Sequence, residues 1–257
     1  MTCIHPTALV DPGAQLGVDV EIGPYTIVGP HVVLGDRTRI MPQVHLDGWL
    51  TLGQECTVFP FASLGSQTQD KKFRGAKTTV TIGDRSVIRE YVTINSGTNE
   101  GDITAVGTDA LIMACCHVAH QCIVGNGVIM ANAAMLSGHV IVEDQVTIGG
   151  MTGVHQFVRI GKMAMVGGCS KINQDVAPFM MVDGNPSRLI GLNSIGLERR
   201  GVSADACKAL KGALKCIFHD NLAVRDALTR VRAEWPGVPE VNHLVTFIEN
   251  SQRGVTR

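Results

Sequence analysis

An aliphatic residue recurs at every sixth position over most of the chain, and this period constrains the fold more than any other feature. One run extends from Ile4 to Leu64, a second from Ile82 to Ile94 and a third from Val106 to Ile172. Together the runs hold 26 hexapeptides, a regularity that chance does not produce. Such repeats are typical of solenoids, in which each unit buries its apolar side against its neighbours.

The hexapeptides predict a parallel β-helix of triangular cross-section. Each repeat supplies a short strand and a corner, so roughly three repeats close one coil, with the aliphatic side chains stacked inside. The composition agrees, because aromatic residues make up only 4% of the chain and 29 residues are glycine. We expect a mainly β domain over residues 1–190, with roughly nine or ten coils.

The period is interrupted twice, over residues 66–81 and 97–105, and both breaks predict loop insertions. After Pro178 the spacing of apolar residues becomes helical. The expected helices are Asn193–Arg200, Ser203–Phe218, Leu222–Trp235 (with Ala223, Leu228 and Val231 on its apolar side) and Pro239–Asn250, with Asn193 and Ser203 as N-caps. Residues 191–257 are therefore predicted to form a small α-helical domain. Its expected role is to cover the otherwise bare end or flank of the solenoid.

Charge and cysteine usage exclude several classes of protein. A net charge of −1 offers no electrostatic footprint for nucleic acid. The eight cysteines form no CxxC pair, so we expect buried, reduced thiols rather than disulfides or a zinc ribbon. We expect no signal peptide, because the first residues lack a basic and an apolar region, and no membrane span, because no apolar run approaches about 20 residues. A cytoplasmic protein is the expectation.

Residues eighteen positions apart are expected to stack on one face of the β-helix. One such column contains His120, Gly138, Gln156 and Gln174, with His139 and His155 beside it in sequence. Histidine is the usual general base near neutral pH. The N–H of a glycine can approach a developing oxyanion closely. Because no serine or cysteine nucleophile motif accompanies them, the column favours direct transfer of an acyl group to a hydroxyl.

Other interpretations of these residues stay open. His139 and His155 are also compatible with surface or interface positions, and His117, His120 and His139 with zinc ligation between subunits. The segment from Gln67 to Lys72 is either a solvated loop or a source of one carboxylate and one ammonium group. Arg199 and Arg200 are compatible either with a surface position near a helix end or with binding of a diphosphate.

Motifs over nearly the whole chain resemble one enzyme family. They are IHPTAL, IGPYTIVGPHV, QDKKF, HVAHQCIVGN, LSGHV, GGMTGVHQFVRIG, VGGCSKINQDV and GLERRG. This pattern resembles the acyl-carrier-protein-dependent UDP-N-acetylglucosamine O-acyltransferases of lipid A synthesis. The resemblance implies a left-handed β-helix and a homotrimer with clefts between subunits. It also implies transfer of an (R)-3-hydroxyacyl chain from acyl carrier protein to the 3-hydroxyl of UDP-N-acetylglucosamine, without a cofactor or metal beyond the donor's phosphopantetheine.

The resemblance also implies a role for individual residues. His120 would be the general base, Asp70 the carboxylate that orients it and Gly138 the oxyanion donor. Gly168 would leave room for a long acyl chain in a groove shared with Gly150 and Met165. The substrate-binding residues would be Gln69, Lys72, His139, His155, Gln156, Asn193, Arg199 and Arg200, and contacts to acyl carrier protein would come from Arg199, Lys162 and Lys171.

Three positions depart from the family's usual pattern, namely Asn95, Ile195 and Pro186. They leave open the acyl length and whether the acceptor carries a 3-hydroxyl or a 3-amine. Two related activities are alternatives. The N-acyltransferases of the same pathway carry an additional domain before their repeats, whereas the repeats begin here at Ile4. Acetyl-CoA-dependent hexapeptide transferases lack the QDKKF and ERRG motifs.

Overall fold

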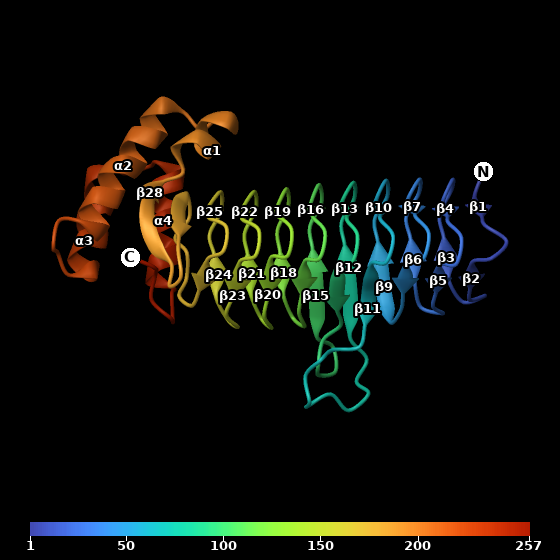
Figure 1. The fold of residues 1–257 in the computed structure, drawn as a ribbon. Coiled ribbons are helices and arrows are strands. Elements are labelled where there is room, and N and C mark those ends of the chain that lie inside the picture. The colour runs from blue at the N-terminus through green and yellow to red at the C-terminus, as the bar shows by residue number, and fades with distance from the viewer.

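Three parallel sheets form the walls of a triangular β-helix in the computed structural model, which describes all 257 residues (Figure 1). Sheet A contains β1 (Cys3–Ile4), β4 (Glu21–Ile22), β7 (Arg39–Ile40), β10 (Thr57–Val58), β13 (Val87–Ile88), β16 (Leu111–Ile112), β19 (Ile129–Met130), β22 (Thr147–Ile148), β25 (Met165–Val166), β27 (Met180–Asp183) and β28 (Arg188–Leu192). Sheet B contains β2 (Leu9–Val10), β5 (Ile27–Val28), β8 (His45–Leu46), β11 (Ser63–Ser66), β14 (Thr93–Asn95), β17 (His117–Val118), β20 (Met135–Leu136), β23 (Gly153–Val154) and β26 (Lys171–Ile172). Sheet C contains β3 (Gln15–Leu16), β6 (Val33–Leu34), β9 (Trp49–Leu52), β12 (Thr79–Ile82), β15 (Ile103–Val106), β18 (Ile123–Val124), β21 (Ile141–Val142) and β24 (Arg159–Ile160).

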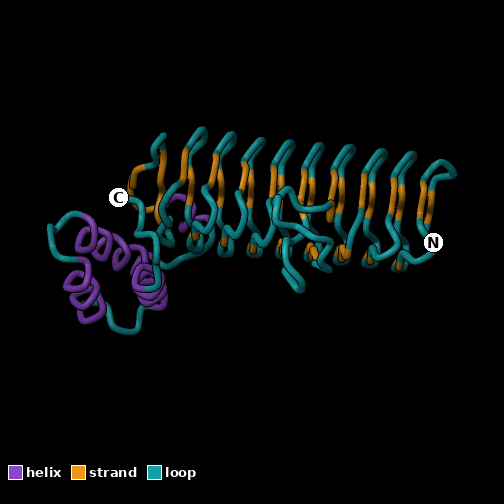
Figure 2. Tube along the Cα trace, turned by 90° about the horizontal axis from the view of Figure 1, so that it is seen from below, coloured by secondary structure: helices purple, strands orange, loops and turns teal.

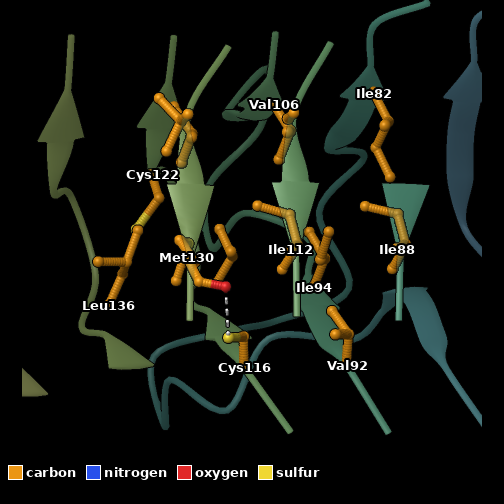
Figure 3. Packing of buried hydrophobic residues seen from close by; sticks show 14 of the residues in the cluster. Ile82, Ile88, Val92, Ile94, Val106, Ile112, Cys116, Cys122, Met130 and Leu136 are labelled. Carbon is orange, nitrogen blue, oxygen red and sulfur yellow. Dashed lines mark hydrogen bonds between the residues drawn. The ribbon is translucent and has the colours of Figure 1, made fainter. Parts of the chain in front are cut away.

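Each hexapeptide forms one strand, which confirms the predicted left-handed β-helix. Strands of successive coils pair in register eighteen residues apart, as Val118 does with Leu136. The periodic aliphatic side chains are buried from Ile22 onward and stack along the axis (Figure 3). Ile4 remains 43% exposed, because the first coil has a neighbour on one side only.

A second inward position, two residues before each periodic aliphatic, also fills the core. Val140, Val146 and Val158 are fully buried there. Cys116 and Cys122 occupy the same position, and burial raises the pKa of the Cys122 thiol to about 12. All eight cysteines are free thiols, as expected. The expectation that they are buried is wrong for Cys3, Cys115 and Cys169, which are exposed.

The corners between strands require an unusual backbone. At the corner between sheets B and C, three successive coils place a non-glycine residue in the left-handed region: Gln121 at φ +55°, His139 at +61° and Phe157 at +65°. Each such residue costs about 1 kcal/mol or more in isolation. The stacked coils offset this cost with hydrogen bonds such as the one from His139 N–H to His120 O, at 3.0 Å.

Both predicted insertions leave the β-helix at the corner between sheets B and C (Figures 1 and 2). The first loop joins β11 to β12 and lengthens its coil. Ser63 therefore pairs with Thr93 of the next coil rather than with a residue eighteen positions later. The second loop joins β14 to β15 and also lengthens its coil, so that Thr79 of β12 pairs with Ile103 of β15. The loops contact one another, since Lys77 N–H donates to the Glu100 carboxylate at 2.8 Å.

The β-structure continues beyond the end of the hexapeptides. After Pro178, β27 pairs in parallel with β25, and β28 then pairs with β27 in antiparallel fashion. These strands need no six-residue period, because backbone hydrogen bonds to the preceding coil direct the pairing. The domain boundary predicted at residue 190 therefore falls inside β28.

Four helices cover the C-terminal end of the β-helix, as predicted (Figure 1). They are α1 (Ser194–Arg199), α2 (Ala204–Phe218), α3 (Val224–Glu234) and α4 (Pro239–Glu249). The side chains of Asn193 and Ser203 cap α1 and α2, which confirms both predicted N-caps. Ala223 is exposed because it is the N-cap of α3, so its predicted place on the apolar side is wrong. No helix has the length and apolar character needed to cross a membrane.

The Glu143–His243 contact joins the β-helix to α4 and makes the stability of this junction depend on pH. His243 Nε2 lies 2.7 Å from the Glu143 carboxylate, which also accepts from Lys162 N–H at 2.8 Å. Burial opposes ionisation of Glu143, but the hydrogen bonds from His243 and Lys162 outweigh it and hold the pKa of the carboxyl below its ordinary value.

We therefore expect Glu143→Gln to lose about 1 kcal/mol of stability at neutral pH. A depressed folded-state pKa contributes stability above the unfolded pKa, and that stability is lost as the pH falls through the folded pKa. The gap between wild type and variant should therefore close below about pH 4. Chemical denaturation at pH 7 and at pH 3 measures the gap; a gap that does not depend on pH would contradict the assignment.

Candidate active site

A pocket of about 550 Å³ lies at the corner between sheets B and C, under the first insertion loop. It contains six of the predicted site residues together with five others. The lining residues are Gln69, Asp70, Lys71, Lys72, Asn95, His117, Ala119, His120, His139, Gln156 and Phe157. A cavity of about 590 Å³ between sheet C and α4 contains none of the predicted catalytic residues.

The predicted column brings the His120 imidazole directly over the backbone of Gly138. A Cβ atom at Gly138 would lie 2.3 Å from His120 Cε1, so only glycine admits the ring in this position. The Gly138 N–H donates to no backbone acceptor, whereas the neighbouring His139 N–H is bonded to His120 O. The next coil adds Gln156 to the same pocket. Imidazole and free N–H are thus adjacent, as base and oxyanion donor require.

The hydrogen-bond partner of the His120 ring is a residue that the sequence reasoning did not single out. His120 Nδ1 contacts Gln121 Oε1, and Gln121 Nε2 contacts the Asp102 carboxylate. Asp102 lies eighteen residues before His120, so extending the column by one coil would have found it. The sequence did not mark Gln121, because its contact with the ring depends on the left-handed backbone conformation of this corner residue, which the repeat pattern does not reveal.

Asp70 lies in the same pocket, but its hydrogen bonds go to its own loop and to the second one. Its carboxylate accepts from Lys72 N–H at 2.9 Å and from Thr98 Oγ1 at 3.3 Å. These bonds, the first being the stronger cause, and the nearby charge of His120 lower the pKa of Asp70. No hydrogen bond joins Asp70 to His120, so its orienting role stays a prediction.

Two other histidines flank His120. The His139 ring lies edge-on to the His120 ring, with centroids 5.3 Å apart, and stacks on Phe157 at 4.6 Å. His117 Nδ1 pairs with Thr93 Oγ1 at 2.7 Å. Burial, followed by the proximity of His120, lowers the pKa of both His117 and His139. Both rings are therefore neutral near pH 7 and place no second positive charge beside the base.

Two further polar residues, His155 and Asn95, differ in how they lie relative to the pocket. His155 is exposed and lies outside the pocket; its Nδ1 is 3.3 Å from Arg253 Nη2, on the C-terminal tail. Asn95 is buried and faces the pocket, and its Oδ1 has no partner. Asn95 therefore leaves one buried acceptor without a hydrogen-bond partner at the wall of the pocket.

The residues predicted to line the acyl groove lie on another face of the same protomer. Gly150 and Gly168 follow β22 and β25 of sheet A, and Gly168 stacks on Gly150. Met165 points outward from sheet A beside Thr147 and Met181. Phe157 and His120 belong instead to the corner between sheets B and C. One protomer therefore does not bring the residues predicted for the acyl groove next to His120.

The residues predicted to hold the uridine diphosphate are also remote from His120 in a single chain. Asn193 is fully engaged, because its amide donates to Met163 O at 2.9 Å and its Oδ1 caps α1. Arg199 is exposed, and burial lowers the pKa of Arg200. Figure 1 shows α1 on the opposite edge of the β-helix from the insertion loops.

The side chains of the pocket show no arrangement typical of a metal centre. No group of three histidine, cysteine, aspartate or glutamate residues within the chain is placed to hold a metal ion. Two of the three suggested zinc ligands are engaged otherwise, since His117 bonds Thr93 and His120 bonds Gln121.

Comparison with known proteins gives a consistent family. Residues 175–256 match the family model described as UDP N-acetylglucosamine O-acyltransferase, domain 2. An acyl-[acyl-carrier-protein]–UDP-N-acetylglucosamine O-acyltransferase from Thermodesulfovibrio yellowstonii is 47% identical, over 100% of both chains. The structure of LpxA from Acinetobacter baumannii is 40% identical with a TM-score of 0.95, over 99% of each chain. LpxA from Bacteroides fragilis, a UDP-N-acetylglucosamine acyltransferase, is 39% identical with a TM-score of 0.96, over 99% of this chain and 100% of that one.

Proposed function

The chain belongs to the UDP-N-acetylglucosamine O-acyltransferase family, and on this basis we propose that it transfers an (R)-3-hydroxyacyl chain from acyl carrier protein to the 3-hydroxyl of UDP-N-acetylglucosamine. This reaction is the first step of lipid A synthesis. The observation that carries the proposal is the His120 ring stacked on the Gly138 backbone within a polar pocket. The proposed compartment is the cytoplasm, where acyl carrier protein is found.

The proposed reaction is a direct transfer with His120 as base. His120 Nε2 takes the proton of the sugar hydroxyl as that oxygen attacks the carbonyl carbon of the thioester. The Gly138 N–H donates to the oxyanion that forms. When the C–S bond breaks, the imidazolium returns its proton to the departing phosphopantetheine thiolate. A new ester and a free thiol result, and no group on the protein is acylated.

Binding of the acceptor is assigned to the polar wall of the pocket. Lys72 is exposed beside Asp70, where its ammonium supports binding of a sugar nucleotide bearing negative phosphates. Gln69, His139 and Gln156 supply neutral donors and acceptors for sugar hydroxyls. The pocket volume suits a sugar ring with part of its nucleotide.

The separation of the two residue sets supports a homotrimer with the active site between subunits. His120 and the insertion loops of one protomer would face Gly150, Met165 and Gly168 of the next. In that arrangement Arg199 and Arg200 would reach the diphosphate, and His155 would border the cleft. Arg199, Lys162 and Lys171 would supply positive charge for the acidic carrier protein. Cross-linking of the purified protein and its mass by light scattering test the trimer.

An assay with purified components tests the proposed activity. (R)-3-Hydroxyacyl carrier proteins of several chain lengths are supplied with UDP-N-acetylglucosamine or its 3-amino analogue, beside acetyl-CoA as an alternative donor. We expect transfer from acyl carrier protein and none from acetyl-CoA. Transfer from no carrier protein would overturn the proposal. No cofactor is proposed, so activity should survive a metal chelator; loss on chelation and recovery with zinc would favour the metal-binding alternative.

Gly168→Met tests the acyl groove. A Cβ at Gly168 would lie 3.3 Å from Gly150 O, and a longer side chain would extend into the space outside sheet A. We expect kcat/KM for the longest accepted acyl chain to fall by at least about tenfold, while a shorter chain is used as well as before. Gly168→Ala, whose single methyl group needs only a small shift, is the matched control. An equal loss for all chain lengths in the methionine variant would contradict the assignment.

A further inference from the structure

We propose that Gln121 and Asp102 together position His120 for proton abstraction, with the Gln121 amide linking the ring to the Asp102 carboxylate. The inference rests on the proposed function, because it gives His120 the part of the base. Neither residue was among those that the sequence or the family resemblance marked as functional. Both are positioning residues, since Gln121 acts on the ring and Asp102 acts through Gln121.

The order of donors along this contact fixes the state of the imidazole. A carboxylate only accepts hydrogen bonds, so the amide nitrogen of Gln121 must face Asp102. The amide oxygen consequently faces His120 Nδ1, and an oxygen only accepts. His120 must therefore carry its proton on Nδ1, which leaves Nε2 free as the basic nitrogen. That is the tautomer a general base in this pocket needs.

The local backbone holds Gln121 in place. Its φ of +55° turns the side chain toward the ring, and its N–H donates to Thr104 Oγ1 at 2.9 Å. Gln121 is half-buried, so its amide is withdrawn from competition with bulk water. In the next two coils the same corner position holds His139 and Phe157, whose rings stack on each other.

Asp102 is held by the second insertion loop. Its carboxylate also accepts from the N–H groups of Thr98, at 3.1 Å, and Asn99, at 2.6 Å. Gly97 permits this packing, because a Cβ there would lie 2.3 Å from Asp102 Cβ. Asp102 thus keeps a fixed negative charge one amide away from the ring, where it stabilises the imidazolium formed during the reaction.

Four variants separate a positioning role from a structural one, and the Gln121→Leu/Asp102→Asn double variant is one of them. Gln121→Leu removes the contacts of the amide with both His120 and Asp102. Asp102→Asn removes the negative charge but keeps an oxygen that accepts from the loop. The Gln121→Glu/Asp102→Asn double variant places the negative charge next to the ring. Gln43→Leu is the matched control, because Gln43 has a left-handed φ of +58° at a corner outside the site.

Modification by diethyl pyrocarbonate gives a readout that does not depend on activity. The reagent attacks the neutral imidazole, so the extent of reaction at His120 against pH, measured by tandem mass spectrometry, gives the midpoint of its titration. The charged and titratable groups around the ring are Asp70, Lys71, Lys72, His117, His139 and Asp102. All but Asp102 are unchanged in these variants.

We expect Gln121→Leu to lower the pH midpoint of the modification relative to wild type, because the imidazolium loses the acceptor of its Nδ1 proton. The kcat for acyl transfer should fall by about 10-fold to 100-fold, with KM for the sugar nucleotide changed less than about threefold. Asp102→Asn should lower the midpoint by less, and its effect should be smaller in the Gln121→Leu background, where only the through-space attraction of the charge is lost. The Gln121→Glu/Asp102→Asn double variant should have a higher kcat and a higher midpoint than Gln121→Leu.

Several results would overturn the proposal. They are an unchanged midpoint and kcat in Gln121→Leu, a midpoint as low in Gln43→Leu, or an Asp102→Asn effect that is undiminished without Gln121. If the wild-type enzyme transferred no acyl group at all, the proposed function would fail. The midpoint measurement would still decide whether Gln121 and Asp102 position His120.

Discussion

Replacing His120 by alanine is expected to lower kcat for acyl transfer by about a thousandfold or more. The side chain is half-buried in the pocket and supplies the only imidazole stacked on a free backbone N–H. Removal of a general base typically costs between about 10² and 10⁴ in rate. His139 does not substitute for it, because its ring lies edge-on, 5.3 Å from that of His120, and packs against Phe157.

The fold should tolerate this substitution, since His120 contributes nothing to the buried aliphatic column. The thermal midpoint and the molecular mass of the His120→Ala protein should match wild type. His219→Ala, at an exposed position after α2, is the matched histidine control and should keep full activity. Full activity in His120→Ala would assign the base to another residue.

Gly138→Ala is expected to lower kcat about a hundredfold. The added methyl group would meet His120 Cε1 at 2.3 Å and Nε2 at 2.7 Å, so the ring must leave the position over the backbone. The corner itself is not strained by the change, because the φ of Gly138 is not in the left-handed region. The loss should therefore appear in kcat, measured by steady-state transfer, rather than in stability.

Gly153→Ala is the matched control for this second variant. Gly153 lies one coil further along sheet B, and a Cβ atom there would meet nothing within 4 Å. It should retain wild-type kcat. Equal activity of Gly138→Ala and wild type would show that the close approach of ring and backbone has no part in catalysis.

The β-helix could be predicted from sequence because one period carries its whole geometry. Once an aliphatic recurs every six residues, the position of each strand and its partner eighteen residues away follow, as for Val118 and Leu136. The end of the β-structure could not be predicted in this way, because β27 and β28 lie outside the six-residue period and form through backbone pairing, β27 with β25 and β28 with β27. The helices were predictable from caps such as Asn193 and Ser203.

The site was predictable to the extent that stacking determines it. Counting by eighteen placed His120 over Gly138 without any structure, and it would also have placed Asp102 one coil before. The side-chain contact made by Gln121 depends on a left-handed backbone that its sequence does not signal. The acyl-groove residues lie on another face because the proposed cleft needs a second subunit, which the sequence of one chain does not arrange in space.

The most direct test of direct transfer by His120 is a rapid-quench single turnover with an acyl-labelled carrier protein and UDP-N-acetylglucosamine. The account predicts that label passes to the sugar nucleotide at the rate at which it leaves the carrier, that none becomes bound to the enzyme, and that His120→Ala leaves it on the carrier. Label trapped on the enzyme, or unimpaired transfer by His120→Ala, would contradict it.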